Sequence, residues 1–359
     1  MKKIAFYFTF VLITGQFCTR ASAQQLLRVG VAGLSHDHVG NIFNQFSRGE
    51  VVIVGIVEND AQLVKKYKDR FSLPDSLFYP KLKDMLKHCK PDAVLAYNAI
   101  ADHIDVVEAC APKHVSVMVE KPLATTVKDA EHIAQLAKRY NIQVLTNYET
   151  TWYPTNQQVY QMVNAHTIGD IQKMVVHDGH QGPVEIGCSP DFLHWLTDPE
   201  KNGGGAVMDF GCYGANLITW LMEGKVPMAV TAITRQVKPK IYPKVDDDAT
   251  ILVDYGTTIG IIEASWNWPF GIKDLEVFGK TGYLHALNGT VLQQRDTATY
   301  YDIPVNPYIY KDNIPYLAAV LRGDIQPQHD LSSLDNNLIV VRILEAAKES
   351  ARTGRKVQL

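Results

Sequence analysis

Short apolar segments and amphipathic helical segments alternate along the first part of the chain, from residue 27 to about residue 147. The apolar segments have the length and β-branched content of strands buried on both faces, and they lie at 28–32, 51–57, 93–97 and 115–119. Between the first two, Val39, Ile42, Phe43 and Phe46 recur at the spacing of one helix face. This alternation predicts a doubly wound parallel sheet, which is an α/β domain.

The first 23 residues have the three parts of a secretory signal. Lys2 and Lys3 form a basic start, residues 4–14 form an apolar core too short to span a bilayer, and Ala21-Ser22-Ala23 is a cleavage site of the A-x-A type. No twin arginine accompanies the core. We therefore expect cleavage after residue 23 and export of the unfolded chain to the periplasm.

The charge and the cysteines exclude several kinds of partner and site. The chain has a formal net charge of −3, and removal of the first 23 residues takes away three basic residues and no acidic one. Such a chain does not favour nucleic acid or an anionic membrane surface. The remaining cysteines include no C-x-x-C pair, which indicates packed thiols and neither a disulfide framework nor a zinc site: Cys89, Cys110, Cys188 and Cys212.

After Tyr148 the pattern changes from helical spacing to period-2 alternation. Strands are predicted at 172–177, 230–235, 249–255, 258–266 and 275–278, and helices at 313–322 and 334–353. This texture is typical of an α+β domain on a large, mostly antiparallel sheet. The sequence therefore predicts a signal peptide at 1–23, a dinucleotide-binding domain at 24–147, and a domain for substrate binding and oligomerisation at 148–359.

The first strand-to-helix turn, residues 33–38, stands where a dinucleotide-binding fold carries its phosphate loop. That loop normally reads G-x-G-x-x-G, so that backbone N–H groups can approach the pyrophosphate. Gly33 supplies the first glycine, Ser35 is small enough to replace the second, and His38 replaces the third. His36 and His38 could also form a metal pair, but no third ligand is tied to them by spacing, and we expect no metal site.

Glu58 ends the second predicted strand. An acid at this position can accept hydrogen bonds from the ribose 2′-hydroxyl and would repel a 2′-phosphate. The alternative is a solvated carboxylate at a strand end. The position favours NAD as the cofactor, with NADP second.

Two further segments carry chemistry. The apolar run from His114 ends in Glu120-Lys121-Pro122, which places a charged pair at the carboxyl edge of the sheet, where ligands bind in open α/β folds. Three glycines at 203–205 lead into a segment expected to be one helix with Asp209 and Tyr213 on the same face. A solvated charge pair and an ordinary capped helix are the alternatives.

Together these residues resemble the family of glucose-fructose oxidoreductase, inositol dehydrogenase and MocA, which are NAD(P)-dependent sugar oxidoreductases. The resemblance covers nearly the whole mature length and implies an N-terminal Rossmann domain. The motifs that carry it are Glu120-Lys121-Pro122, the loop ending at His103, the stretch from Asn147 to Pro154, the block from Gly203 to Tyr213, the run 246–250 and the C-terminal segment 349–357.

The resemblance implies roles for single residues. Lys121 matches the active-site lysine, with a cis peptide bond expected before Pro122. Asp209 matches the acid of the motif, and Tyr213 stands where relatives carry histidine or tyrosine as the acid/base partner. The residues expected to line the cofactor are Gly33, Ser35, His36, Glu58, Asn98, His103, Glu120 and Lys121. The altered phosphate loop leaves the pose of the pyrophosphate open.

Oxidation of a sugar alcohol needs a hydride acceptor, a base for the hydroxyl proton and a cation beside the forming alkoxide. Lys121 can be the cation, and Tyr213 or Asp209 the base. A tyrosine can serve at neutral pH only if the neighbouring ammonium lowers its pKa. A substrate held between the domains would be lined by Trp152, His177, His180 and Trp195.

We therefore predict an exported NAD-dependent oxidoreductase that transfers hydride between a hydroxyl carbon of a sugar, or of a sugar derivative, and tightly held nicotinamide. The partner is a small sugar or glycoside, and we expect a homo-oligomer, either a dimer or a tetramer. Two alternatives stay open. One is an NAD-dependent glycosidase that works by transient oxidation and elimination, and the other is a non-catalytic sugar-binding protein on the same fold.

Overall fold

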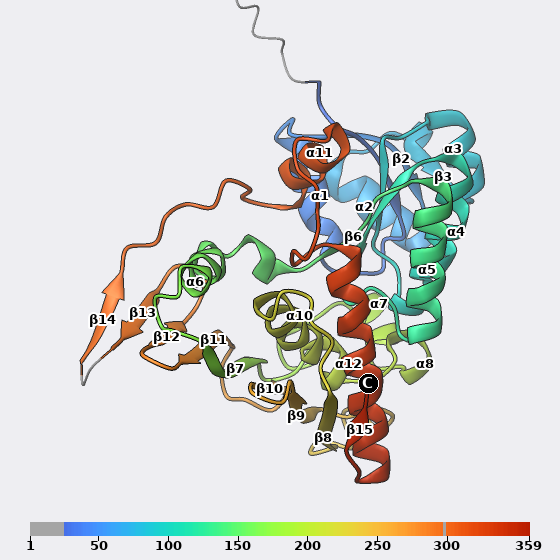
Figure 1. Cartoon of the computed structure of the whole chain (residues 1–359). Helices are drawn as coiled ribbons and strands as arrows, with labels where there is room; N and C mark the ends of the chain where they lie inside the picture. The colour runs from blue at the N-terminus through green and yellow to red at the C-terminus, as the bar shows by residue number, and fades with distance from the viewer. Residues whose placement is uncertain (1–24, 297–298) are drawn as a thin grey trace, which may run out of the picture.

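A computed structural model describes residues 25–296 and 299–359 of the chain. The predicted signal segment lies outside these residues. The described residues form two sheets with helices (Figure 1). Among the described helices, none has both the length and the apolar content needed to cross a membrane.

The first sheet has six parallel strands in the order β3-β2-β1-β4-β5-β6, which confirms the predicted doubly wound topology. The strands are β1 (Arg28–Ala32), β2 (Val52–Val57), β3 (Phe78–Tyr79), β4 (Ala93–Ala96), β5 (Ser116–Glu120) and β6 (Val144–Asn147). Helices cover both faces, with α1 and α2 in one apolar core and α3, α4 and α5 in the other. Their bounds are α1 (Val39–Ser47), α2 (Ala61–Phe71), α3 (Leu82–Cys89), α4 (His103–Cys110) and α5 (Val127–Tyr140).

Local signals set the helix ends in this domain. The Oγ1 atom of Thr126 accepts a hydrogen bond from the backbone N–H of Asp129, so Thr126 caps α5 at its N-terminus. The helix ends at Asn141, which takes the left-handed conformation. Short 3-10 turns complete the connections, at Asp75–Leu77, Ile100–Asp102, Ala111–Lys113 and Glu149–Trp152.

The second sheet has nine strands in the order β14-β13-β12-β11-β7-β10-β9-β8-β15. Among the described pairings, β7 and β10 run parallel and the others antiparallel, so the sheet is mostly antiparallel as predicted. The bounds are β7 (Ile171–Gly179), β8 (Ala229–Arg235), β9 (Asp248–Asp254), β10 (Ile259–Ser265), β11 (Ile272–Gly279), β12 (Tyr283–Ala286), β13 (Leu292–Arg295), β14 (Tyr300–Ile303) and β15 (Val357–Gln358).

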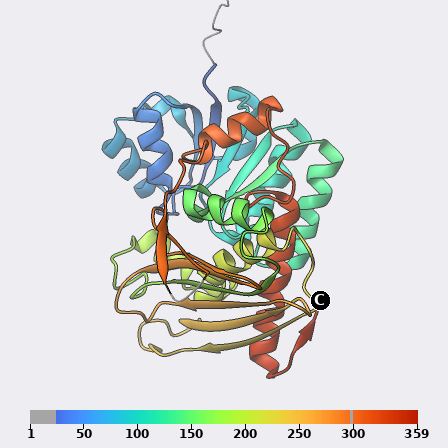
Figure 2. The ribbon, with the colours of Figure 1, turned by 60° about the vertical axis from the view of Figure 1, so that its left-hand side comes forward.

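Helices lie on one face of this second sheet, and no helix of the described residues packs against its other face (Figure 2). The helix α10 packs on β7 and β10, and α12 packs on β8. The remaining helices of the chain are α6 (Pro154–Asn164), α7 (Pro190–Leu196), α8 (Pro199–Asn202), α9 (Ala206–Asp209), α10 (Gly211–Leu221), α11 (Asn313–Arg322) and α12 (Leu334–Thr353). The bounds of α11 and α12 confirm the two helices predicted near the C-terminus.

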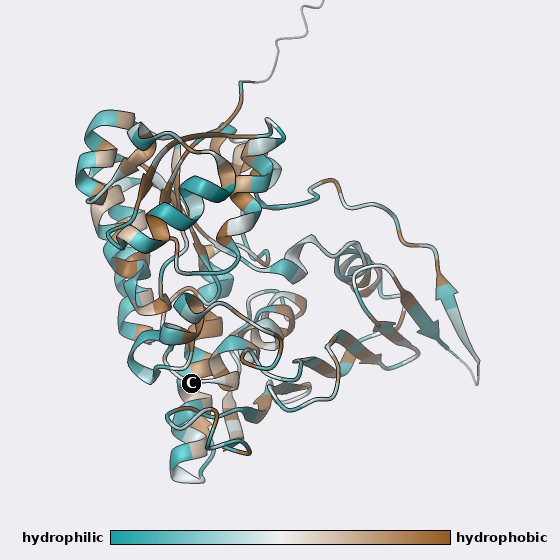
Figure 3. Cartoon of the chain, turned by 180° about the vertical axis from the view of Figure 1, so that it is seen from behind, coloured by the Kyte–Doolittle hydropathy of each residue, from teal (hydrophilic) through white to brown (hydrophobic). Residues whose placement is uncertain are grey.

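The C-terminal part of the chain returns to the first domain. Ile314, Leu317 and Val320 of α11 are buried in the same core as β1, α1 and α2. The long helix α12 contacts α5 and β6 of the first domain as well as α10 and β8 of the second. A single domain boundary after residue 147 therefore does not separate the two domains completely, because α11 follows this boundary and covers one side of the first sheet. The helices around that sheet carry bands of hydrophilic and hydrophobic residues (Figure 3).

Candidate active site

A buried lysine and a buried aspartate meet where the two domains face each other. Lys121 follows β5 directly, at the carboxyl edge of the parallel sheet, and its peptide bond to Pro122 is cis, as expected. Its Nζ lies 2.5 Å from Oδ1 of Asp209 and donates to the backbone oxygen of Asp209 at 2.9 Å. The other carboxylate oxygen of Asp209 accepts a hydrogen bond from Nε1 of Trp266 at 2.9 Å. Both partners are therefore buried and hydrogen-bonded.

The two side chains stay charged in this setting. Burial opposes the ammonium form of Lys121, but the carboxylate of Asp209 outweighs it and raises the pKa of Lys121. Burial likewise opposes ionisation of Asp209, and the nearby ammonium together with Trp266 lowers the pKa of this carboxyl all the same. An ammonium and a carboxylate are thus held in place before any substrate arrives.

The segment that carries Asp209 is not one helix, which corrects the expectation from the sequence. Asp209 ends the short helix α9, and Tyr213 lies in α10, which begins at Gly211. The backbone N–H of Tyr213 bonds to the oxygen of Phe210, while the oxygen of Asp209 accepts from Lys121. The backbone oxygen of Asp209 therefore faces Lys121 and takes no part in the backbone hydrogen bonds of α10.

Tyr213 lies beside the pair but is not prepared to act as a base. Its ring centre is 4.9 Å from Nζ of Lys121 and 4.4 Å from Nζ of Lys273. Burial raises the pKa of this phenol well above its ordinary value, and the carboxylates of Asp178 and Glu149 add to the effect. The lowering that the sequence analysis required for Tyr213 is absent, and Asp209 is the better candidate for the base.

A second lysine and a second buried carboxylate lie near Tyr213, on two paired strands of the nine-stranded sheet. Lys273 of β11 and Asp178 of β7 are register neighbours, with 3.8 Å between Nζ and Oδ1. Lys273 also bonds to the carboxylate of Glu149 at 2.7 Å. Neither carboxylate oxygen of Asp178 has a hydrogen-bond partner among the described residues, and burial raises the pKa of Asp178 to about 8.

This second pair was not predicted, although the sequence contains a signal for it. Asp178 shares one face of β7 with Met174 and Val176, and Lys273 shares one face of β11 with Leu275, all in phase with the buried side of the sheet. A charged residue in phase with apolar neighbours has to be buried. Such a position is an indication of function when the charge has no solvent to stabilise it.

A cleft of about 1120 Å³ runs along the carboxyl edge of β1, β2 and β4. Gly33 and Ser35 line it from the phosphate loop, together with Glu58 and Asn98 from the ends of β2 and β4. Gly33 has a φ of +83°, and a side chain there would collide with Asn98, which explains the glycine. Oε2 of Glu58 accepts from the backbone N–H of Leu34 at 2.9 Å, so this carboxylate also fixes the loop.

The cleft fits a dinucleotide. Its size is that of a site for a large cofactor, and two buried polar atoms of residues that line it, Oδ1 of Asn98 and Nε1 of Trp195, have no partner among the described residues. Nε2 of the buried His103 is likewise unpartnered, and burial lowers the pKa of this ring to about 4, so the ring is neutral. Several loop N–H groups donate within the protein, among them those of Gly33 and His36. The pyrophosphate would therefore find fewer free N–H groups than in a regular phosphate loop.

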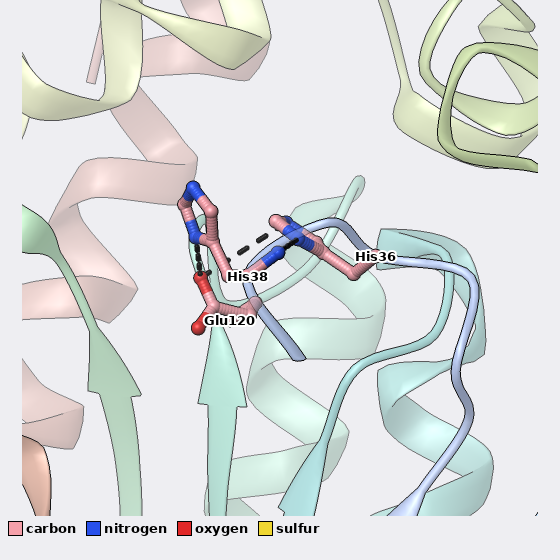
Figure 4. A group of neighbouring side chains, drawn as sticks. All are labelled: His36, His38 and Glu120. Carbon is pink, nitrogen blue, oxygen red and sulfur yellow. Dashed lines mark hydrogen bonds and ion pairs between the residues drawn. The ribbon is translucent and has the colours of Figure 1, made fainter. Parts of the chain in front are cut away.

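His36, His38 and Glu120 form a cluster between the phosphate loop and the end of β5 (Figure 4). Nδ1 of His38 lies 3.0 Å from Oε2 of Glu120, and Nε2 of His36 lies 4.0 Å from the same atom. Glu120 therefore supplies the third ligating group that spacing alone did not reveal. However, the backbone N–H of His38 donates to Nδ1 of His36, so the neutral His36 ring carries its proton on Nε2, toward Glu120. This arrangement favours a hydrogen-bond network over a metal centre.

The four residues expected to line the substrate do not gather around Asp209. His180 lies near it, with its ring centre 4.9 Å from that of Phe210, and the Asp209 charge acts on it. His177 is in alternate phase with Asp178, so it lies on the opposite face of the sheet, where it pairs with Asp274 at 2.7 Å. Trp195 packs against His36 in the cofactor cleft, and Trp152 lines a second cavity beside α1. The structure therefore does not bring these three into one pocket with His180.

Comparison with known families gives the two domains the same assignment. Residues 27–148 match the oxidoreductase family with an NAD-binding Rossmann fold, and residues 156–285 match the GFO/IDH/MocA C-terminal domain. The D-xylose 1-dehydrogenase [NADP(+)] of Haloarcula marismortui is 22% identical over 81% of each chain. The trans-1,2-dihydrobenzene-1,2-diol dehydrogenase of Xenopus tropicalis is 24% identical over 50% of this chain, and the match spans about half of that relative, 51%.

Solved structures share the complete fold. The aldose-aldose oxidoreductase of Caulobacter crescentus, in complex with glycerol, superposes with a TM-score of 0.78 at 20% identity over 93% of this chain and 100% of the other. An inositol dehydrogenase homologue of Azotobacter vinelandii, in complex with NAD+, gives 0.80 at 17% identity over 94% and 98%. With both domain families matched in chain order, the protein belongs to the GFO/IDH/MocA family of oxidoreductases.

Proposed function

We propose that this chain is an exported NAD-dependent oxidoreductase that transfers hydride between a hydroxyl carbon of a sugar, or of a sugar derivative, and tightly held nicotinamide. The observation that carries the proposal is the buried Lys121–Asp209 pair at the edge of the sheet, next to a cleft that fits the dinucleotide. The names of family relatives support the substrate class, since one is called a D-xylose 1-dehydrogenase and another an aldose-aldose oxidoreductase.

Lys121 and Asp209 have different roles in the proposed reaction. Bound NAD supplies the hydride acceptor. Asp209 takes the hydroxyl proton, and Lys121 places its positive charge beside the oxygen on which negative charge develops. Trp266 holds the second carboxylate oxygen and fixes the orientation of the acid. His180 offers a hydrogen on Nε2, because its Nδ1 accepts from the backbone N–H of Gly182 at 2.9 Å, and this hydrogen can bind a second sugar oxygen.

The second lysine and carboxylate favour one further candidate, an NAD-dependent glycosidase. Oxidation of one ring carbon acidifies the hydrogen on its neighbour, and removal of that proton would require a second base. Asp178 has a pKa raised to about 8, so its ionised form is basic enough for the task, and Lys273 could stabilise the enolate. The glycosidic oxygen would leave with a proton, water would add to the double bond, and the hydride would return to the sugar. An ordinary dehydrogenase needs no such second base.

Export and retention of the nucleotide belong to the same proposal. The basic and apolar N-terminal segment supports Sec-type export, and free NAD is scarce outside the cytoplasm. An enzyme that keeps its nucleotide and returns the hydride in each cycle would not need a supply. A dimer or tetramer is also proposed, supported by apolar side chains on the helix-free face of the second sheet: Ile233, Leu252 and Ile259 are 54%, 40% and 42% exposed.

Dialysed protein mixed with a panel of sugars tests the proposal. We expect a single burst of reduced nicotinamide, equal in amount to the protein, without added NAD. Steady formation of NADH that depends on added NAD would contradict retention of the nucleotide. Absence of any reduction with every sugar, in protein loaded with NAD, would contradict the oxidoreductase activity itself. Release of free sugar from a glycoside without net NADH would favour the glycosidase.

A further inference from the structure

A second cavity of about 410 Å³ is lined by Glu120, the residue before Lys121, and shares no lining residue with the cofactor cleft. It is enclosed by α1, by the ends of β5 and β6, and by the start of α11, which returns from the far end of the chain. Its size is in the range of small-molecule sites. The helix α11 follows both segments that match the family models, so this wall is built by a part of the chain far in sequence from α1 and β5.

The lining is polar on nearly all sides. Side-chain amides of Asn41 and Asn44 line the cavity from exposed positions of α1, and no hydrogen bond within the described chain occupies them. Gln45, which is 4% exposed, donates from Nε2 to Asn313 at 3.1 Å, while its Oε1 is buried without a partner in the described residues. A buried acceptor with no donor indicates that a ligand or water completes the site. Trp152 adds an aromatic ring to the wall.

The charges select against an anion. The carboxylates of Glu120, Glu149 and Asp312 line the cavity together with a single guanidinium, that of Arg48, which is already bonded to Glu50 at 2.7 and 2.8 Å. A phosphate or a carboxylate would meet an excess of like charge. A neutral ligand with many hydroxyl groups would accept hydrogen bonds from the open amides of Asn41 and Asn44, could donate one to the unpartnered Oε1 of Gln45, and could lie against the indole ring.

The cavity is connected to the reacting pair through short contacts. Glu120 is the residue before Lys121, and Glu149 bonds to Lys273, whose Nζ is 4.4 Å from the ring centre of Tyr213. Lys121 lies 4.9 Å from the same ring centre. We propose that this cavity binds the second, non-reacting sugar unit of an uncharged glycoside whose first unit reacts at Lys121. The inference rests on the proposed function and names its substrate class as a glycoside larger than one ring.

The test compares the wild-type holoprotein with Asn44→Trp, which fills the cavity from an exposed helix position. The matched control is Gln62→Trp on α2, an exposed amide that lines neither cavity. The probes are glucose, cellobiose, maltose, lactose and trehalose, with reduction of bound NAD as the readout. We expect the second-order rate constant for reduction of bound NAD by at least one disaccharide to exceed that for glucose by about tenfold or more. Asn44→Trp should abolish that excess and leave glucose within about twofold, and the control should change neither.

Three outcomes would overturn the proposal: no disaccharide exceeds glucose, the excess survives in Asn44→Trp, or both kinds of sugar weaken equally in that variant. Failure of the proposed function is distinguishable, because then no sugar reduces the bound nicotinamide. In that case calorimetry measures the binding of the same disaccharides to the cavity, independently of nicotinamide reduction. Binding that Asn44→Trp removes and Gln62→Trp keeps would support the site, and absence of binding to the wild type would overturn it.

Discussion

Two buried lysine–carboxylate pairs flank the ring of Tyr213, and they differ in how completely their hydrogen bonds are made. In the first pair Lys121 and Asp209 are in direct contact at 2.5 Å, and Trp266 occupies the remaining carboxylate oxygen. In the second pair 3.8 Å separates Lys273 from Asp178, and no described residue donates to either oxygen of Asp178. One pair is complete, whereas the other leaves two acceptors open.

The difference between the two pairs indicates that they have different chemical roles on the two sides of the Tyr213 ring. A complete pair has its charges fixed in advance, which suits stabilisation of a developing alkoxide because no reorganisation is needed during the reaction. An incomplete pair has a carboxyl whose pKa is raised to about 8, which makes it a group that can take up or release a proton near neutral pH. We assign the first pair to hydride transfer, with Asp209 as the base for the hydroxyl proton, and the second pair to a further proton transfer or to binding of sugar hydroxyl groups.

The largest expected effect comes from removal of each lysine in turn. Lys121→Ala should lower the rate of nicotinamide reduction by roughly two to four orders of magnitude, because the cation acts mainly in the transition state. Lys273→Ala should lower it by roughly tenfold or less, since this lysine is not bonded to the proposed base. Stopped-flow absorbance of the bound nicotinamide measures both rates. Equal losses of rate in the two variants would contradict the different roles assigned to the two pairs.

Removal of a carboxylate from the complete pair should also destabilise the fold. Asp209→Asn leaves the ammonium of Lys121 buried without its counter-charge and should lower the free energy of unfolding by about 3 to 5 kcal/mol. The wild-type contribution is present above the ordinary carboxyl pKa and is lost as the pH falls through the lowered pKa of the folded state. Urea unfolding measures it. In the exposed Lys65–Asp69 pair, Asp69→Asn is the control and should cost less than about 1 kcal/mol.

The corresponding change in the second pair, Asp178→Asn, should raise the free energy of unfolding at alkaline pH. Because burial raises the pKa of Asp178 in the folded state, the folded protein holds a proton that the unfolded chain releases near pH 4. Stability of the wild type should therefore fall as the pH rises from about 4 to about 8. Asp178→Asn should remove this slope and gain on the order of a few kcal/mol over wild type at pH 9. Parallel stability curves for the two proteins would show that Asp178 ionises normally.

The smallest effect is expected at the far end of the cofactor cleft, away from both pairs. Glu58 lines the cleft and should favour NAD by repelling a 2′-phosphate. Glu58→Ser should reduce the preference for NAD over NADP by about tenfold and leave the rate with saturating NAD nearly unchanged. Equilibrium binding of both nucleotides measures the preference. Equal affinities in the wild type would remove Glu58 from cofactor selection.

Much of the architecture could be predicted from the sequence because local patterns determine it. The alternation of apolar and amphipathic segments predicted the parallel sheet and the strands β1, β2, β4 and β5, but not β3 and β6. The helices α11 and α12 were predicted with the bounds that the structure has. The strands β12 to β14 were not predicted. β13 reads Leu-Gln-Gln-Arg and β14 lies mostly exposed, so neither has the apolar alternation that marks a half-buried strand.

The site was only partly predictable, for a different reason. Motifs pointed to Lys121 and Asp209, and the structure brings them together. The break between α9 and α10 was not predicted, because no proline marks it and the contact of the Asp209 oxygen with Lys121 joins residues far apart in the chain. The roles of Asp178 and Lys273 depend on which face of a strand is buried, which becomes certain only when the neighbouring strands are placed.

The central claim is that hydride passes directly from a sugar carbon to nicotinamide held by this chain. The most direct test is to mix the NAD-loaded protein with fully deuterated aldoses and glycosides, remove the free sugar, and weigh the nucleotide recovered from the protein by mass spectrometry. The account predicts reduced nucleotide that carries one deuterium from the sugar, and its loss in Lys121→Ala. Recovery of only unlabelled nucleotide after incubation with every sugar would contradict the account.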